Sequence, residues 1–182
     1  MKRSGRFAKS MPEPQWLKNS GLPCIFILLT ITPSGKIIMS RQQHHEKLQR
    51  MYLNAAVNRQ YEPKISVSRG EAEVIIEVKE DFFHSAHSVH GSVYFKVLDD
   101  SSYFAASSLV TDCHLVTVSY NLYFLRPVKE GFLRGVGKVV NSSRRVIVAE
   151  SEVFDSRGKL AARGSGTFMK SSLPLDENVG YL

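Results

Sequence analysis

The 182-residue chain has only two cysteines, no Gly-rich phosphate loop and no apolar run long enough to cross a bilayer as a helix. Cys24 and Cys113 lie far apart without a CxxC spacing, which argues against a disulfide framework and a thiolate zinc site and fits a reducing compartment. The apolar run at 22–32 is shorter than the roughly 20 residues that a spanning helix needs. We therefore expect a cytoplasmic protein without a membrane span.

The chain also lacks a basic face on its probable folded domain, although its net charge is +7. Residues 1–38 hold six basic residues and one acidic residue, a net charge of +5. Residues 39–182 hold 18 basic and 16 acidic residues, a net charge of only +2. A protein that reads nucleic acid carries its charge on the folded face that docks. We therefore expect no nucleic-acid partner.

The N-terminal extension, residues 1–38, differs in composition from the rest of the chain. Its basic, Pro-containing start is followed by the apolar run, after which no A-x-A cleavage pattern appears. Three interpretations stay open: an added element such as an extra strand, a secretory or membrane-interface segment, and sequence upstream of a natural start at Met39. The remainder predicts one domain, 39–170, and a polar C-terminal tail, 171–182, that we expect to fray.

The first part of the domain predicts a helix followed by two strands. Ser40 and Gln43 have the spacing of a capping box, and apolar residues recur at helical spacing over 41–59. We expect this helix to be a packing element without a role in a site. Strands are predicted over 65–68 and 71–79, the second because apolar residues alternate along it.

A mostly apolar stretch, 90–106, predicts a buried central helix, and four extended segments follow it. Turn-like sequences separate these segments, which favours an antiparallel meander because parallel strands need longer crossovers. The expected fold class is α+β, with one antiparallel sheet wrapped around the long helix and a second protomer covering the outer side of that helix. The four predicted strands are 115–125, 132–140, 145–154 and 159–169.

Two carboxylates, Asp99 and Asp100, lie within this apolar helix, where an ionised group is costly unless it is paired or used. Asp99 follows Phe95 by four residues and Ser92 by seven, so it shares a stripe with the start of the helix. Asp100 follows Lys96 by four residues, and we expect a surface ion pair of little energetic weight. Asp99 is therefore the preferred functional carboxylate. A buried carboxylate satisfied by neighbouring donors is the alternative.

The run Val-His-Gly-Ser-Val-Tyr-Phe-Lys-Val-Leu-Asp-Asp at 89–100 resembles the hotdog-fold acyl-CoA thioesterases of the phenylacetic-acid-degradation (PaaI-like) type. That family has an Asn, a His-Gly-Gly that begins six residues later, and an acidic residue nine positions after the His. Here His90 and Gly91 match the start of the triplet, and Asp99 matches the acidic position.

Two positions depart from the family pattern. His84 stands at the Asn position, and Ser92 replaces the second Gly of the triplet. Segments 116–127 and 158–169 match further features, and the resemblance covers approximately 41–169. The departures concern substrate class and activity, because the family Asn orients the water or the thioester and a His also titrates near neutrality.

The resemblance implies a hotdog fold and hydrolysis of an acyl-CoA or acyl-carrier thioester in lipid or aromatic acid metabolism, without a cofactor. It implies Asp99 as base or nucleophile, and Thr117 as the polar strand residue that assists the water. We interpret His84 as a substrate-orienting donor and His90 as a helix-start residue that fixes the loop. The expected assembly is a homodimer, with a dimer of dimers as the larger form.

The start of the helix offers backbone N–H groups, at Gly91 and Ser92, where an oxyanion would be stabilised. Gly91 and Asp99 lie eight residues apart, which is roughly 12 Å along a helix. Asp99 therefore cannot serve the oxyanion site of its own helix. If two central helices run antiparallel across a two-fold axis, Asp99 faces Gly91 of the partner subunit, and each dimer has two composite sites.

A metal site and two other functions are the alternatives to the thioesterase interpretation. His84, His87 and His90 form an HxxHxxH pattern, and three imidazoles suit zinc. Steps of three residues drift around a helix, however, and no nearby carboxylate supports the set, so we expect no metal. A non-catalytic acyl-CoA-binding hotdog module is the alternative function. A hydratase or dehydratase needs a His and acid pair in Pro- or Asn-rich surroundings, which we do not find.

Overall fold

A computed structural model of the protein describes residues 30–31, 37–38 and 40–182. The three interpretations of 1–38 concern residues that lie almost entirely outside this described part; within it, β1 and β2 form a short antiparallel pair. The elements are β1 Thr30–Ile31, β2 Ile37–Ile38, α1 Arg41–Asn54, η2 Ala56–Arg59, β3 Lys64–Ser68, β4 Glu71–Glu77, η3 Glu80–Phe82, β5 Phe83–His84, β6 Ser88–Val89, α2 Gly91–Ser107, β7 Cys113–Phe124, β8 Phe132–Ser142, β9 Val146–Asp155, β10 Leu160–Pro174 and η4 Glu177–Val179.

Helix α1 begins at the predicted capping box and ends earlier than predicted. The Ser40 hydroxyl accepts from the Gln43 N–H at 3.2 Å, and the Gln43 side chain accepts from the Ser40 N–H at 2.9 Å. The helix stops at Asn54 because the chain turns extended at the next residue, and η2 follows as a separate turn. The Tyr52 carbonyl at the helix end accepts from the Ala55 N–H at 3.1 Å and from the Asn58 side-chain amide at 2.6 Å.

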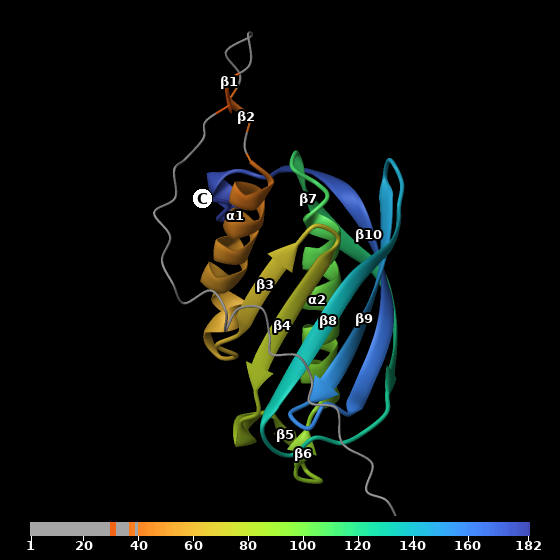
Figure 1. The fold of residues 1–182 in the computed structure, drawn as a ribbon. Helices are drawn as coiled ribbons and strands as arrows, with labels where there is room; N and C mark the ends of the chain where they lie inside the picture. The colour runs from red at the N-terminus through yellow and green to blue at the C-terminus, as the bar shows by residue number, and fades with distance from the viewer. Residues whose placement is uncertain (1–29, 32–36, 39) are drawn as a thin grey trace, which may run out of the picture.

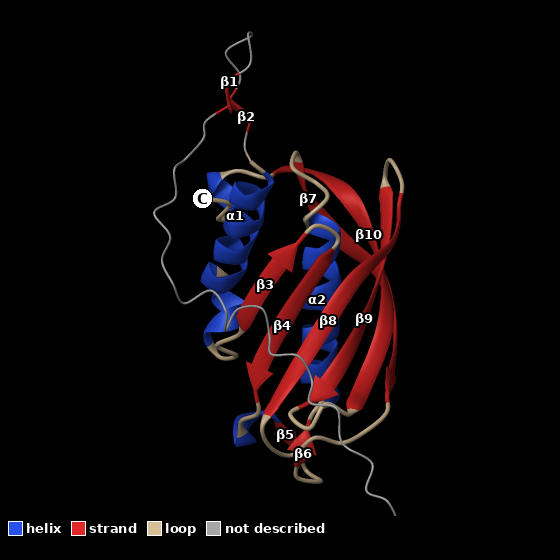
Figure 2. Cartoon of the chain, in the orientation of Figure 1, coloured by secondary structure: helices blue, strands red, loops and turns tan. Residues whose placement is uncertain are grey.

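The large sheet has six antiparallel strands in the order β3-β4-β8-β9-β10-β7 (Figure 2). The predicted meander is correct for β8, β9 and β10 but wrong for β7, which pairs with β10 instead of β8. The segment 125–131 is long enough to cross the end of the sheet, whereas tight turns join the strands of the meander. As a result β7 lies at an edge, and its outer side pairs with no strand among the described residues.

Helix α2 lies in the hollow of this sheet, which confirms the predicted α+β hotdog architecture (Figure 1). Val97, Leu98 and Ala105 are completely buried between the helix and the strands. The helix approaches β8 so closely that a Cβ atom added at Gly137 would lie 2.2 Å from the carbonyl oxygen of Ser101. Neither α2 nor any other helix in the described part is long and apolar enough to cross a membrane.

The C-terminal residues are ordered against α1, contrary to the predicted frayed tail. Strand β10 continues to Pro174, and the chain then returns to α1. Tyr181 is only 5% exposed, and its hydroxyl lies 2.6 Å from Nδ1 of His44. A buried tyrosine combines apolar contact with a hydroxyl that needs a partner, and both requirements are met here.

Candidate active site

One stripe of α2 stays open while its other faces pack against the sheet. Ser92 is exposed, Phe95 is 39% exposed and Asp99 is half-buried. These positions lie on one side of the helix because they follow each other at three and four residues. The stripe predicted from the sequence is therefore present, with the helix start at one end and a carboxylate at the other.

Asp99 has a single hydrogen-bond donor among the described side chains. The Thr117 hydroxyl on β7 donates to Oδ1 of Asp99 at 3.1 Å. The pKa of Asp99 is raised to about 6, chiefly by burial and to a smaller extent by the nearby Asp100 charge, whereas the Thr117 hydrogen bond and Lys96 act in the opposite direction. A carboxyl group with such a pKa is ionised at neutral pH and remains basic enough to take a proton.

Asp100 forms the predicted ion pair with Lys96, but the pair belongs to a buried network and not to the surface as predicted. Its side chain is only 17% exposed, and its Oδ2 accepts from Lys96 at 2.7 Å and from the Tyr52 hydroxyl at 2.6 Å. The Lys96 ammonium also lies over the rings of Tyr52 and Tyr61, at 5.4 and 5.0 Å from their centroids. Burial raises the pKa of Asp100, and Lys96 and Tyr52 oppose that effect. Adjacent carboxylates thus have different surroundings.

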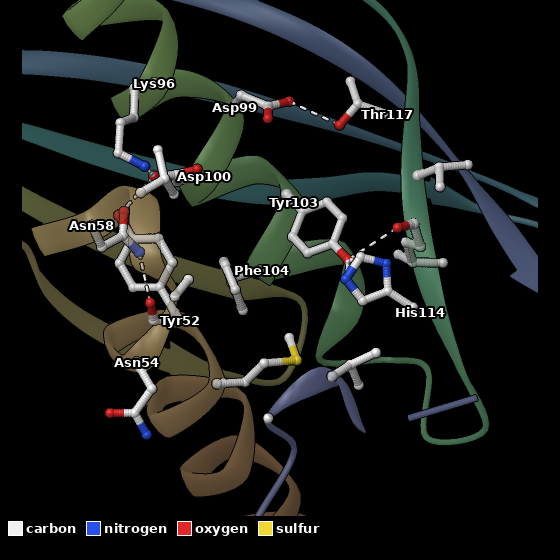
Figure 3. Close-up of a pocket in the computed structure, with 17 residues that line it drawn as sticks. Tyr52, Asn54, Asn58, Lys96, Asp99, Asp100, Tyr103, Phe104, His114 and Thr117 are labelled. Atoms are coloured by element: carbon white, nitrogen blue, oxygen red, sulfur yellow. Dashed lines mark hydrogen bonds and ion pairs between the residues drawn. The ribbon is translucent and has the colours of Figure 1, made fainter. Parts of the chain in front are cut away.

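Asp99 and Thr117 lie at one side of a cavity of about 600 Å³ (Figure 3). Helix α1, η2, α2, β7 and the C-terminal residues all contribute to its wall. Lys96, Asp99 and Asp100 place charge at one side of this space. Most of the remaining wall is apolar, formed by Met51, Val57, Phe104, Leu115, Val116 and Val179. Cavities of this size with a few polar groups are typical of small-molecule sites.

Helix α1 contributes to this site, although the sequence suggested only a packing role. Tyr52 both lines the cavity and bonds to Asp100, 48 residues away in the sequence. Met51 and Asn58 also line the cavity. A tyrosine on the apolar face of a helix was the available signal, because its hydroxyl requires a buried partner.

The start of α2 forms a second, separate pocket of about 610 Å³. Gly91 lines it, and the Phe124 ring packs so closely that a Cβ atom at position 91 would lie 2.9 Å from the tip of the ring. His90 is the N-cap, as predicted, and its Nδ1 accepts from the Ser92 N–H at 3.1 Å. The Ser92 hydroxyl lies 2.8 Å from the same nitrogen.

This capping changes the predicted pair of oxyanion donors. Because His90 already takes the Ser92 N–H, that amide is occupied. The Gly91 N–H has no hydrogen-bond acceptor among the described residues and lies at the positive end of the helix dipole. The start of the helix therefore offers one unused donor, at Gly91, rather than two.

His84 lines the same pocket as Gly91, on the short β5–β6 hairpin. Its Nδ1 accepts from the Ala86 N–H at 3.0 Å, so Nε2 carries the proton and donates to the Ser88 hydroxyl at 2.9 Å. The three histidines of the HxxHxxH pattern do not gather: within the described part, no three His, Cys, Asp or Glu side chains are placed to hold a metal ion.

Two groups of predicted residues therefore lie at different places in one chain. Asp99 and Thr117 line the first cavity, and His84, His90 and Gly91 line the second pocket. No residue lines both pockets. The described residues of a single chain do not bring the carboxylate and the Gly91 amide together.

Known proteins share the segment that carries Asp99 and Thr117 as well as His90 and Gly91. Residues 86–162 match the family model of the thioesterase superfamily. A protein of Saccharolobus solfataricus named "Putative esterase SSO2140" is 32% identical over 104 residues, which cover 57% of this chain and 74% of that protein.

Solved structures share the fold. The E. coli PaaI protein from the phenylacetic acid degradation operon is 22% identical and superposes with a TM-score of 0.68, over 74% of this chain and 97% of that chain. The conserved protein PA5202 of Pseudomonas aeruginosa is 26% identical, with a TM-score of 0.62 over 73% of this chain and 100% of that chain.

Proposed function

The chain belongs to the thioesterase superfamily, as the sequence resemblance predicted, and from that premise we propose that it hydrolyses acyl-CoA thioesters to the free acid and CoA. Membership of the superfamily supports thioester hydrolysis in general. The observation that carries the specific proposal is Asp99, a half-buried carboxylate on the open stripe of α2 that faces a cavity and, among the described side chains, bonds only to Thr117. Asp99 acts as the base or the nucleophile.

The proposed site is completed by a second copy of the chain. Along α2, Asp99 and Gly91 lie roughly 12 Å apart, too far for one thioester carbonyl to contact both. The outer edge of β7 is unpaired among the described residues, and such an edge readily pairs with another strand. Apolar side chains are also exposed on and beside this edge: Phe95 is 39%, Val116 46% and Val118 54% exposed.

A homodimer joined along this face accounts for these features. In the proposed arrangement the two α2 helices run antiparallel across a two-fold axis, so that Asp99 faces Gly91 of the partner subunit. Each dimer then has two equivalent sites, as isologous symmetry requires. A dimer of dimers is the larger assembly that we propose.

The reaction follows from the groups at each half of this composite site. Asp99 removes a proton from water as the oxygen attacks the thioester carbon, or attacks that carbon itself. The carbonyl oxygen becomes negative and accepts from the N–H of Gly91 of the partner subunit, an interaction whose loss typically costs about 3 kcal/mol of barrier height. The C–S bond then breaks, and the CoA sulfur leaves as a thiolate that takes up a proton. Where Asp99 attacks directly, a water then hydrolyses the acyl–Asp99 anhydride, which releases the free acid and restores the carboxylate.

The role of the remaining predicted residues follows from their positions. Thr117 holds the Asp99 carboxylate in place through its hydroxyl. His90 fixes the helix start by capping it. His84 lies beside it in the second pocket, and its Nε2–H orients the substrate by exchanging the Ser88 hydroxyl for a substrate acceptor.

Substitution of Asp99 by Asn tests the proposal. Purified wild type, Asp99→Asn and Asp112→Asn are compared on short, medium, long-chain and aryl acyl-CoAs. We expect Asp99→Asn to lose at least about 100-fold in kcat/KM, because a general base contributes about that much or more. Asp112 lies between α2 and β7, and its side chain is 70% exposed. Asp112→Asn therefore serves as the matched control, which is expected to keep wild-type activity.

Two outcomes contradict the proposal in different ways. Equal activity of Asp99→Asn and wild type shows that the carboxylate has no part in the reaction. Absence of turnover for every thioester, with acyl-CoA binding retained, shows a non-catalytic acyl-CoA-binding module instead.

A further inference from the structure

Residues 176–182 form a C-terminal segment that returns from the sheet to α1 (Figure 1). Asp176 starts it by accepting from the Asn178 N–H at 2.9 Å, which caps the short η4 turn. Val179 and Gly180 follow, and both line the cavity that contains Asp99. Tyr181 then packs against His44 and Lys47 of α1.

Hydrogen bonds through one buried histidine connect this segment to α1 and α2. The Tyr181 hydroxyl donates to Nδ1 of His44 at 2.6 Å, while Nε2 of His44 donates to the carbonyl of Ser107, the last residue of α2, at 3.1 Å. His44 is 2% exposed, and burial lowers its pKa, which favours the neutral ring that this arrangement needs. Arg50 adds a hydrogen bond to the Leu182 carbonyl at 2.9 Å. The segment is therefore held in a fixed position.

The fixed segment closes the cavity at the side away from the proposed chemistry. In Figure 3 the Asp99 and Thr117 pair lies at one side of the space, and the blue ribbon of the C-terminal segment lies at the other, beside α1. Met51 of α1 lines the cavity beside Gly180, since a Cβ atom added at position 180 would lie 4.0 Å from Met51. A group that enters past Asp99 therefore meets an apolar wall before it reaches the segment.

We propose that the C-terminal segment sets the length of the acyl group, with Val179 as the side chain against which the far end of the acyl group stops. This inference rests on the proposed function and extends it to substrate class. The favoured substrates are thioesters of apolar acyl groups large enough to fill the cavity of about 600 Å³. An acetyl group leaves most of the apolar wall without contact, and unfilled apolar surface contributes no binding.

Opposite changes in side-chain size at Val179 test this proposal. Wild type, Val179→Ala and Val179→Phe are compared by kcat/KM on saturated acyl-CoAs from acetyl to palmitoyl. Loss of two methyl groups lengthens the cavity, so we expect Val179→Ala to raise the ratio of long-chain to short-chain kcat/KM by about tenfold. Val179→Phe shortens it and is expected to lower that ratio by about tenfold.

A matched control separates this effect from a general loss of packing. Val140→Ala makes the same deletion at an exposed position on β8, 59% exposed and outside the cavity, and is expected to keep the wild-type chain-length profile. Opposite shifts by the two Val179 variants support the proposal, because unfolding lowers activity on all substrates alike. An unchanged profile in both variants, with wild type active, overturns it.

Binding of S-alkyl CoA thioethers, which cannot be hydrolysed, distinguishes failure of this proposal from failure of the proposed function. Calorimetry with the same chain lengths measures the preference without turnover. If wild type hydrolyses no thioester, the proposed function fails. If Val179→Ala and Val179→Phe shift the chain-length preference in thioether binding in opposite directions, the C-terminal segment is still supported as the limit on chain length. If both variants bind every thioether as the wild type does, that role of the segment is overturned.

Discussion

Asp99 and Asp100 are neighbours in the sequence and line the same cavity, but their side chains have different partners. Asp100 points toward α1, and one of its oxygens accepts from Tyr52 of α1 and from Lys96 of its own helix, both within 2.7 Å. Asp99 points toward β7 and receives one hydrogen bond, from Thr117 at 3.1 Å. The first carboxylate is satisfied by a cation and a hydroxyl, whereas the second keeps acceptor capacity for a ligand.

One helix therefore carries a structural carboxylate and a candidate catalytic carboxylate at consecutive positions. A rotation of about 100° between consecutive residues places the two groups on different faces of α2. Lys96 then partners the structural carboxylate, and the negative charge of Asp100 helps to keep the Asp99 pKa high. Three substitutions test this division, in addition to Asp99→Asn.

The largest effect on stability is expected from Asp100→Asn. The substitution leaves the Lys96 ammonium, whose side chain is only 12% exposed, without its carboxylate, and removing one partner of a buried pair costs about 3 kcal/mol. The free energy of unfolding from urea titrations, at matched protein concentration, measures the loss. The control is Glu77→Gln, which breaks an exposed pair with Lys64 and is expected to cost less than about 0.5 kcal/mol.

The same variant also tests the link between the two carboxylates. Removing the Asp100 charge lowers the pKa of Asp99, so the acid limb of the kcat/KM profile is expected to move to lower pH. If Asp100→Asn is no less stable than Glu77→Gln, the Lys96 network does not have the structural role assigned to it.

A smaller loss of stability is expected from Tyr52→Phe. The ring stays in place beneath Lys96, and only the hydroxyl that donates to Asp100 is removed. Hydrogen bonds to charged groups contribute about 2 kcal/mol, and the unfolding free energy should fall by about that amount. Tyr123→Phe removes the hydroxyl of a side chain that is 67% exposed and should leave stability unchanged. If Tyr52→Phe is as stable as Tyr123→Phe, the Tyr52 hydroxyl does not stabilise the network, and only Lys96 and Asp100 do.

The smallest effect is expected from Thr117→Val, and it appears as a shift in the pH dependence of kcat/KM. Asp99 acts in its ionised form, so kcat/KM of the wild type should fall as the pH drops through about 6, the pKa of this group. The Thr117 hydrogen bond favours the ionised carboxylate and lowers that pKa. Its removal should therefore move the acid limb to higher pH while activity at alkaline pH changes little.

Thr111→Val is the control for this shift. Thr111 is exposed and lies before β7, outside the cavity. The pH profile of kcat/KM of Thr111→Val should therefore match that of the wild type. A shift of the Thr117→Val limb toward lower pH would contradict the assignment of Thr117 as the donor that stabilises ionised Asp99.

Features set by neighbouring residues could be predicted from the sequence. The capping box at Ser40 and the N-cap at His90 depend on side chains within three residues, and the structure confirms both. The stripe that joins Ser92 to Asp99 depends only on helical spacing. These features are local, so spacing and residue type are sufficient to predict them.

Features set by distant residues could not be predicted in the same way. The pairing of β7 with β10 depends on which strand edge remains available after the meander has formed, and turn-like separators carry no such information. Tyr52 reaches Asp100 across 48 residues, and Tyr181 reaches His44 across 137. Periodicity marks each of these residues as buried but does not identify its partner.

The close contact between Gly137 and the Ser101 carbonyl has a consequence for how this protein can vary. Any side chain at position 137 would push α2 away from β8, since even a Cβ atom would lie 2.2 Å from that oxygen. Ser101 lies two residues beyond Asp99, so such a change would displace the carboxylate from Thr117 and from the cavity. Position 137 therefore limits which mutations the lineage can accept, although it touches no substrate and carries no side chain.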